Sequence, residues 1–63
     1  MDQTLQLLAT QIEDRRKQMI ESLGDGAAKD YPSYQLAVGV IRGYLTVQGL
    51  IADLAKNMEQ FDD

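Results

Sequence analysis

Residues that interrupt helices are concentrated in one short segment of this 63-residue chain. The segment begins with Gly-Asp-Gly at positions 24–26 and ends with Asp-Tyr-Pro at positions 30–32. Glycine readily adopts the left-handed conformation that ends a helix, and proline is favoured in the first helical turn. The segment therefore predicts one helix before it, one helix after it, and a turn over residues 24–31.

The amino-terminal part carries apolar residues at helical spacing. They are Leu5, Leu8, Ile12, Met19 and Leu23. We predict a helix over residues 3–23, with Asp2 or Thr4 as its N-cap and a stop at Gly24 in the left-handed conformation. Arg16 lies on the apolar stripe of this helix. Either its stem covers the stripe while its head reaches water or Glu13, or its head pairs with a carboxylate of a partner.

The carboxy-terminal part contains no helix breaker other than glycine from Pro32 to Gln60. Tyr31 precedes a proline, which disfavours the helical conformation, whereas Pro32 suits the first helical position. We therefore predict a second, longer helix over residues 32–60. Two helices joined by a short turn lie antiparallel, so the predicted fold class is all-α. The single expected domain, residues 1–63, is a two-helix hairpin that is completed by oligomerisation or by a larger partner.

Two apolar stripes run along the second predicted helix. One has heptad spacing and comprises Val40, Tyr44, Val47, Ile51, Leu54, Met58 and Phe61. The other comprises Tyr34, Val38, Ile41 and Leu45. Together they are wider than one short helix covers. The width indicates either a rather apolar helix in a two-helix pair or, the interpretation we prefer, a second interface. Because the second helix is longer, we expect Met58 and Phe61 to overhang the first helix and to anchor another molecule.

Three glycines, Gly39, Gly43 and Gly49, lie inside the second predicted helix. Each costs about 1 kcal/mol of helix stability relative to alanine. Gly39 and Gly43 share one face, where the absence of side chains permits another helix to approach closely. Either such a contact or weak selection on this helix explains them. The candidate protein-binding residues are Gly39, Val40, Gly43, Tyr44, Val47, Ile51, Leu54, Met58 and Phe61.

The composition offers little for catalysis or for holding a cofactor. The chain has no histidine and no cysteine, so it lacks imidazole bases, thiolates and the commonest metal ligands. A net charge of −4 disfavours binding to nucleic-acid phosphates. Its apolar runs are short, which favours neither a signal peptide nor a membrane span. We expect no catalytic residue, cofactor or metal, and no nucleic-acid or membrane partner. Small chains without disulfides or metals commonly depend on oligomerisation or on a partner.

Several stretches of the sequence resemble small helical proteins that tailed bacteriophages encode, often among their head and tail genes. The stretches are Lys29-Asp30-Tyr31-Pro32-Ser33-Tyr34, Val38-Gly39-Val40-Ile41-Arg42-Gly43 and Ile51-Ala52-Asp53-Leu54. The run Glu13-Asp14-Arg15-Arg16 is similar to a run in the first helix of those proteins. The resemblance extends from about Ile12 to Leu54.

This resemblance implies a structural or assembly protein of a tailed-phage virion, and the lack of catalytic residues predicts no enzymatic activity. The implied partners are copies of the chain itself or a larger capsid, portal or tail protein. The implied location is the virion, or the host cytoplasm during assembly. The alternative is a small acidic phage-encoded protein that binds and regulates a host enzyme, since a net charge of −4 suits a basic cleft.

Overall fold

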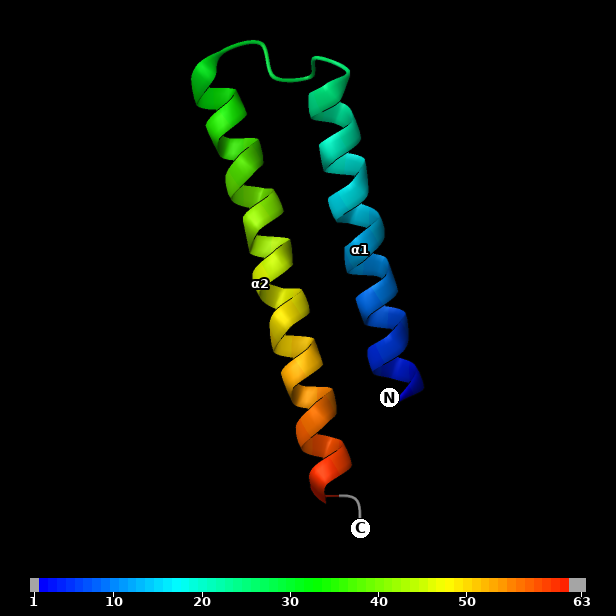
Figure 1. Cartoon of the computed structure of the whole chain (residues 1–63). Coiled ribbons are helices and arrows are strands. Elements are labelled where there is room, and N and C mark those ends of the chain that lie inside the picture. Colours follow the sequence, from blue (N-terminus) through cyan, green and yellow to red (C-terminus); the bar gives the residue numbers. More distant parts are fainter. Residues whose placement is uncertain (1, 62–63) are drawn as a thin grey trace.

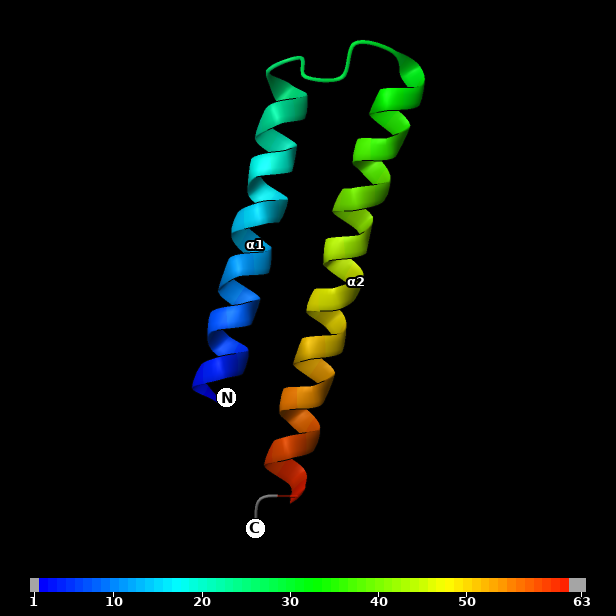
Figure 2. The ribbon, with the colours of Figure 1, turned by 180° about the vertical axis from the view of Figure 1, so that it is seen from behind.

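Two long helices lie side by side and run in opposite directions in the computed structural model (Figures 1 and 2). Helix α1 is Gln3–Gly24 and helix α2 is Tyr31–Phe61. The structure describes residues 2–61, without the side chains of residues 59–61, and this part of the chain contains no strand. The prediction of an all-α hairpin with a longer second helix is confirmed.

Helix α1 begins and ends with hydrogen bonds that its sequence supplies. The Asp2 carboxylate accepts hydrogen bonds from the backbone N–H groups of Thr4, at 2.7 Å, and Leu5, at 3.2 Å. The prediction that Gly24 takes the left-handed conformation is wrong, because Gly24 is the last helical residue and Gly26 has the positive φ of 85°. The Gly26 N–H donates to the Leu23 carbonyl at 3.1 Å, so the chain turns away two residues later than expected.

Helix α2 starts at Tyr31, one residue before Pro32. Asp30 precedes the helix, and its carboxylate accepts a hydrogen bond from the Ser33 N–H at 2.8 Å. Its backbone carbonyl accepts from the Tyr34 N–H at 3.1 Å. Proline is tolerated in this first turn because the N–H group that it lacks would have no hydrogen-bond acceptor within the helix there. The Asp30 cap can therefore hold the first turn with Pro32 in it. Asp30 thus overrides the steric preference of the residue before proline.

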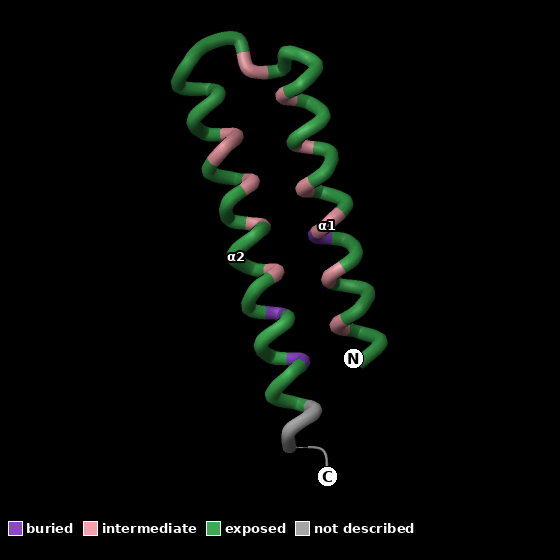
Figure 3. Tube along the Cα trace, viewed as in Figure 1, coloured by how far each residue is buried: buried purple, intermediate pink, exposed green. Residues whose placement is uncertain are grey.

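The hairpin has a thin core between the helices. Only Ile12, Ile51 and Ala55 are classed as buried among the described side chains (Figure 3). Half-buried residues extend this contact along both helices. On α1 the residues facing the contact are Leu5, Ala9, Ile12, Arg16, Met19 and Leu23. On α2 they are Ala37, Ile41, Tyr44, Gln48, Ile51 and Ala55, which we call the inner face of α2. The molecule is a rod of 52 × 16 × 11 Å.

The carboxy-terminal turns of α2 extend beyond the amino end of α1 (Figure 1). This is the overhang expected from the unequal lengths of the two helices. Met58, one of its two predicted anchors, is 43% exposed. The other predicted anchor, the side chain of Phe61, lies outside the described residues.

Candidate functional site

A second row of apolar residues runs along α2 beside the inner face and is exposed in the part of the chain that the structure describes. Its members are Leu36, Gly39, Val40, Gly43, Val47, Leu50, Leu54 and Met58, which we call the outer face of α2. All eight are exposed, and among the large side chains of the row Leu36 at 72% and Leu50 at 62% are the most exposed. Most of them immediately precede an inner-face residue in the sequence, as Leu50 precedes Ile51. Successive residues of a helix are about 100° apart, so the two faces are neighbours on its surface.

The structure divides the predicted binding residues between these two faces. Ile51 is 7% exposed and Tyr44 is half-buried, so both lie in the contact with α1 and neither belongs to the free surface. The other described members lie on the outer face. They are Gly39, Val40, Gly43, Val47, Leu54 and Met58. Leu36 and Leu50 complete the outer face and were missed by the sequence analysis.

The three helical glycines of α2 leave open space around them. A Cβ atom built at Gly39, Gly43 or Gly49 would meet nothing within 4 Å outside the local helix backbone. Packing within the hairpin therefore does not require a glycine at any of these positions. Gly39 and Gly43 open a gap in the apolar outer face, whereas Gly49 lies on a different side of the helix by its spacing from Gly43.

A polar network crosses the contact between the helices. Glu13 and Arg16 form a bidentate ion pair, with Arg16 Nη2 2.7 Å from Glu13 Oε1 and Arg16 Nε 3.2 Å from Glu13 Oε2. Gln48 of the inner face donates a hydrogen bond to the same Glu13 carboxylate. The head of Arg16 therefore pairs within its own helix while its stem covers the contact, which agrees with the first of the two interpretations of this residue.

The Glu13–Gln48 bond also shows how side chains meet in this hairpin. When residues are paired from the turn, with Leu23 opposite Tyr34, antiparallel geometry puts Tyr44 opposite Glu13. Gln48 lies one helical turn further along α2 than Tyr44. Side chains lean toward the amino end of their own helix. In an antiparallel pair, side chains of Glu13 and Gln48 therefore lean toward each other and close this gap.

We expect the hairpin to lose stability in acid. Hydrogen bonds from Arg16 and then Gln48 lower the pKa of Glu13, and hydrogen bonds from Ser33 lower the pKa of Asp30. A carboxyl whose pKa is lower in the folded state stabilises that state above its unfolded pKa, about 4.3 for Glu and 3.9 for Asp. This contribution is lost as the pH falls below these values. Urea unfolding followed by circular dichroism at pH 7 and pH 3 measures it.

The control for this acid effect is Glu13→Gln, which removes the titrating group but keeps the side-chain length. We expect this variant to be less stable than the natural chain at pH 7 and to lose less stability on going to pH 3. An equal loss in both chains would contradict the assignment of the effect to Glu13.

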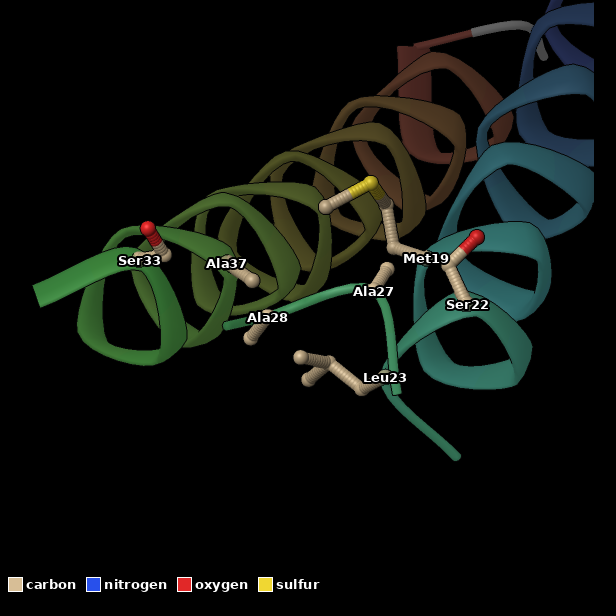
Figure 4. A pocket seen from close by; sticks show the side chains of 7 residues that line it. All are labelled: Met19, Ser22, Leu23, Ala27, Ala28, Ser33 and Ala37. Carbon is tan, nitrogen blue, oxygen red and sulfur yellow. The ribbon is translucent and has the colours of Figure 1, made fainter. Parts of the chain in front are cut away.

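A shallow pocket lies at the closed end of the hairpin (Figure 4). It is lined by Met19, Ser22, Leu23, Ala27, Ala28, Ser33 and Ala37. Its volume is about 120 Å³. Small-molecule sites are usually about 300–1,000 Å³ and carry convergent polar groups. This pocket is therefore too small for a drug-sized ligand. Among the described residues, no three acidic side chains are grouped closely enough to hold a metal ion.

The segment Tyr31–Met58 is long and apolar enough to cross a membrane, by length and composition alone. Its uninterrupted apolar runs are short, which predicted no membrane span, whereas the length and mean hydropathy of the whole helix permit one. Arg42 lies near the middle of the segment, and a charged side chain at the centre of a bilayer costs at least about 2.5 kcal/mol. Asp53 and Lys56 add two further charges toward its end. A bilayer is thus a physical competitor for the exposed apolar surface of α2.

Comparisons of this chain with protein-family models, with curated proteins and with solved structures found no match.

Proposed function

We propose that this chain is a non-enzymatic assembly protein that docks through the outer face of α2. Its expected setting is a tailed-phage virion, where the docking surface belongs to copies of the chain or to a larger capsid, portal or tail protein. The observation that carries the docking function is the continuous exposed row from Leu36 to Met58. Contiguous exposed apolar surface of this kind is typical of interaction sites.

The glycines of the outer face support docking on protein. Gly39 and Gly43 each cost helix stability, and nothing inside the hairpin requires them. A partner side chain that enters the open space beside them offsets this cost. A lipid acyl chain is fluid and gains less from a gap of fixed shape. The gap beside the glycines therefore suits a partner of fixed shape, and the charges of Arg42, Asp53 and Lys56 favour a protein partner over a bilayer.

The experiment that tests this function is quantitative mass spectrometry of purified particles and of infected cells. We expect the protein in particles at a fixed number of copies per particle, because a docking component is retained by its interface. Presence in infected cells and absence from particles, together with co-purification of a host enzyme, would favour the regulatory alternative and overturn the proposal.

A second measurement separates protein docking from membrane insertion. The purified chain is mixed with vesicles of phosphatidylcholine and centrifuged through a density gradient. We expect the chain to stay in the dense fraction. Flotation with the vesicles would show that α2 enters lipid, and would overturn docking on protein as the role of the outer face.

A further inference from the structure

We infer that the outer face of α2 binds a second copy of this chain, with the two α2 helices antiparallel. The inference rests on the proposed docking function and names the first partner of that surface. The two hairpins form a four-helix bundle in which the outer faces are buried at the centre of the dimer contact.

The chain exposes more surface than a compact monomer of its mass, and the excess is close to the area that one partner buries in a dimer. The hairpin exposes 5017 Å². A compact monomer of 7.0 kDa exposes about 4,000 Å². The excess of about 1,000 Å² is near the roughly 800 Å² that each partner buries in a stable interface of standard size. One further protein surface, rather than several, is therefore sufficient to cover it.

The outer face is complementary to itself when it is reversed. From Gly43 to Leu54 its steps are four, three and four residues, which read the same in both directions, so a two-fold axis between Gln48 and Gly49 brings this central part of the row onto its own copy. Val47 then faces Leu50 of the second copy, and Gly43 faces Leu54 of the second copy. The gap at Gly43 thus receives a leucine side chain. Because of the symmetry, this fit of a large residue into a gap occurs twice in the dimer.

The charges at the edge of the outer face suit the same orientation. Arg42 and Asp53 are exposed and border this face on the side away from the inner face. The reversed alignment brings Arg42 of one copy toward Asp53 of the other, at the rim of the contact. Opposite charges at a rim add little affinity but fix the register and the orientation. None of the outer-face residues is charged, so no charge is buried at the centre.

The angle between the two faces of α2 also fits a closed bundle. Inner and outer faces are about 100° apart, close to the right angle between the two neighbours of a helix in a square four-helix bundle. Each α2 therefore sits at a corner, with α1 of its own chain on one side and α2 of the second copy on the other.

Sedimentation equilibrium and light scattering on the full chain test the inference. We expect a mass of twice 7.0 kDa for the natural chain. Gly43→Leu places two leucines in one gap and should weaken the dimer at least about tenfold, since overpacking is destabilising. The matched control is Gly49→Leu, the same change in the same helix at another open position. We expect it to remain dimeric, and both variants to be as helical as the natural chain or more so.

A compensating variant keeps this test independent of folding. Gly43→Leu combined with Leu54→Gly exchanges the leucine and the gap without changing the composition, and should restore dimerisation. A natural chain that remains monomeric at millimolar concentration overturns the inference. So does a Gly43→Leu chain that dimerises as tightly as the Gly49→Leu chain.

Cysteine variants report the orientation, because the natural chain has no cysteine. Val47→Cys and Leu50→Cys chains are mixed and oxidised, and the products are distinguished by mass. The antiparallel dimer predicts disulfides between the two different variants. Disulfides that join each variant mainly to itself would indicate parallel helices and would overturn the inference.

Failure of this inference and failure of the proposed function are distinguishable. A folded monomer that is still present in particles overturns only the second copy as partner, because the outer face then docks on a larger protein. A dimer that is absent from particles supports the inference and overturns the proposed function.

Discussion

Replacing Ile51 with alanine should remove a large share of the hairpin's stability and lower its melting temperature markedly. Among the side chains that the structure describes, Ile51 is one of three that are buried, and the other two, Ile12 and Ala55, lie in the same thin core. Truncation of a buried isoleucine to alanine typically costs about 2–5 kcal/mol. At about 0.05–0.15 kcal/mol per residue, a chain of this length has a stability of only about 3–9 kcal/mol. The loss is therefore comparable with the whole free energy of unfolding. Thermal melting followed by far-UV circular dichroism measures it.

The matched control for the core prediction is Leu7→Ala. Leu7 lies on α1, is 60% exposed, and is not among the residues of α1 that face α2. Truncation of an exposed side chain usually changes stability by no more than about 0.5 kcal/mol. If the Ile51→Ala chain melts at the temperature of the Leu7→Ala chain, Ile51 does not hold the helices together and the assignment of the inner face is wrong.

Replacing Leu50 with lysine should abolish docking while leaving the hairpin folded. Leu50 is 62% exposed within the single chain, so the lysine head remains in water there. In a docked state the same position is at the centre of the contact, where an unpaired charge is strongly unfavourable. Loss of a central apolar anchor alone commonly costs about 2 kcal/mol or more, so we expect affinity to fall by at least about thirtyfold. Sedimentation equilibrium and incorporation into particles measure this loss.

Leu7→Lys is the control for the docking prediction, because Leu7 and Leu50 are almost equally exposed. We expect this chain to associate like the natural one. Equal association of the Leu50→Lys and natural chains, with helicity unchanged in both, would contradict docking through the outer face.

The existence of the two helices was predictable because the signals that begin and end them are local. Asp2 caps α1, Asp30 caps α2, and the turn residues between them act within a few positions. The exact residues at which the helices begin and end depended on competition between such signals. At the start of α2 the cap at Asp30 outweighed the preference of Tyr31. At the end of α1 the hydrogen bond from Gly26 to Leu23 outweighed the preference of Gly24 for a left-handed turn.

The binding surface was only partly predictable because α2 is apolar on two adjacent faces. The predicted stripe alternated between them: Val47 is on the outer face, and Ile51 is on the inner one. The apolar stripe of α1 is too narrow to cover both faces of α2, so only one of them packs on it. Polar contacts across the helices help to select that face. Gln48 was overlooked because a polar residue does not register as part of an apolar stripe, yet it hydrogen-bonds Glu13. Recurrent pairs of adjacent apolar residues, such as Leu50 and Ile51, were the available signal.

The turn between α1 and α2 has a consequence for how fast the molecule forms. It spans residues 25–30, and every contact between the helices depends on this single closure. Chains dominated by such local topology fold in microseconds to milliseconds. Closing a loop of about ten residues takes only about 10–100 ns. The hairpin therefore reforms many times during one slow encounter with another molecule. Under the proposed docking function, folding is not the slow step, so the rate of docking should follow the concentration of the docking sites, and chaperones have little to accelerate.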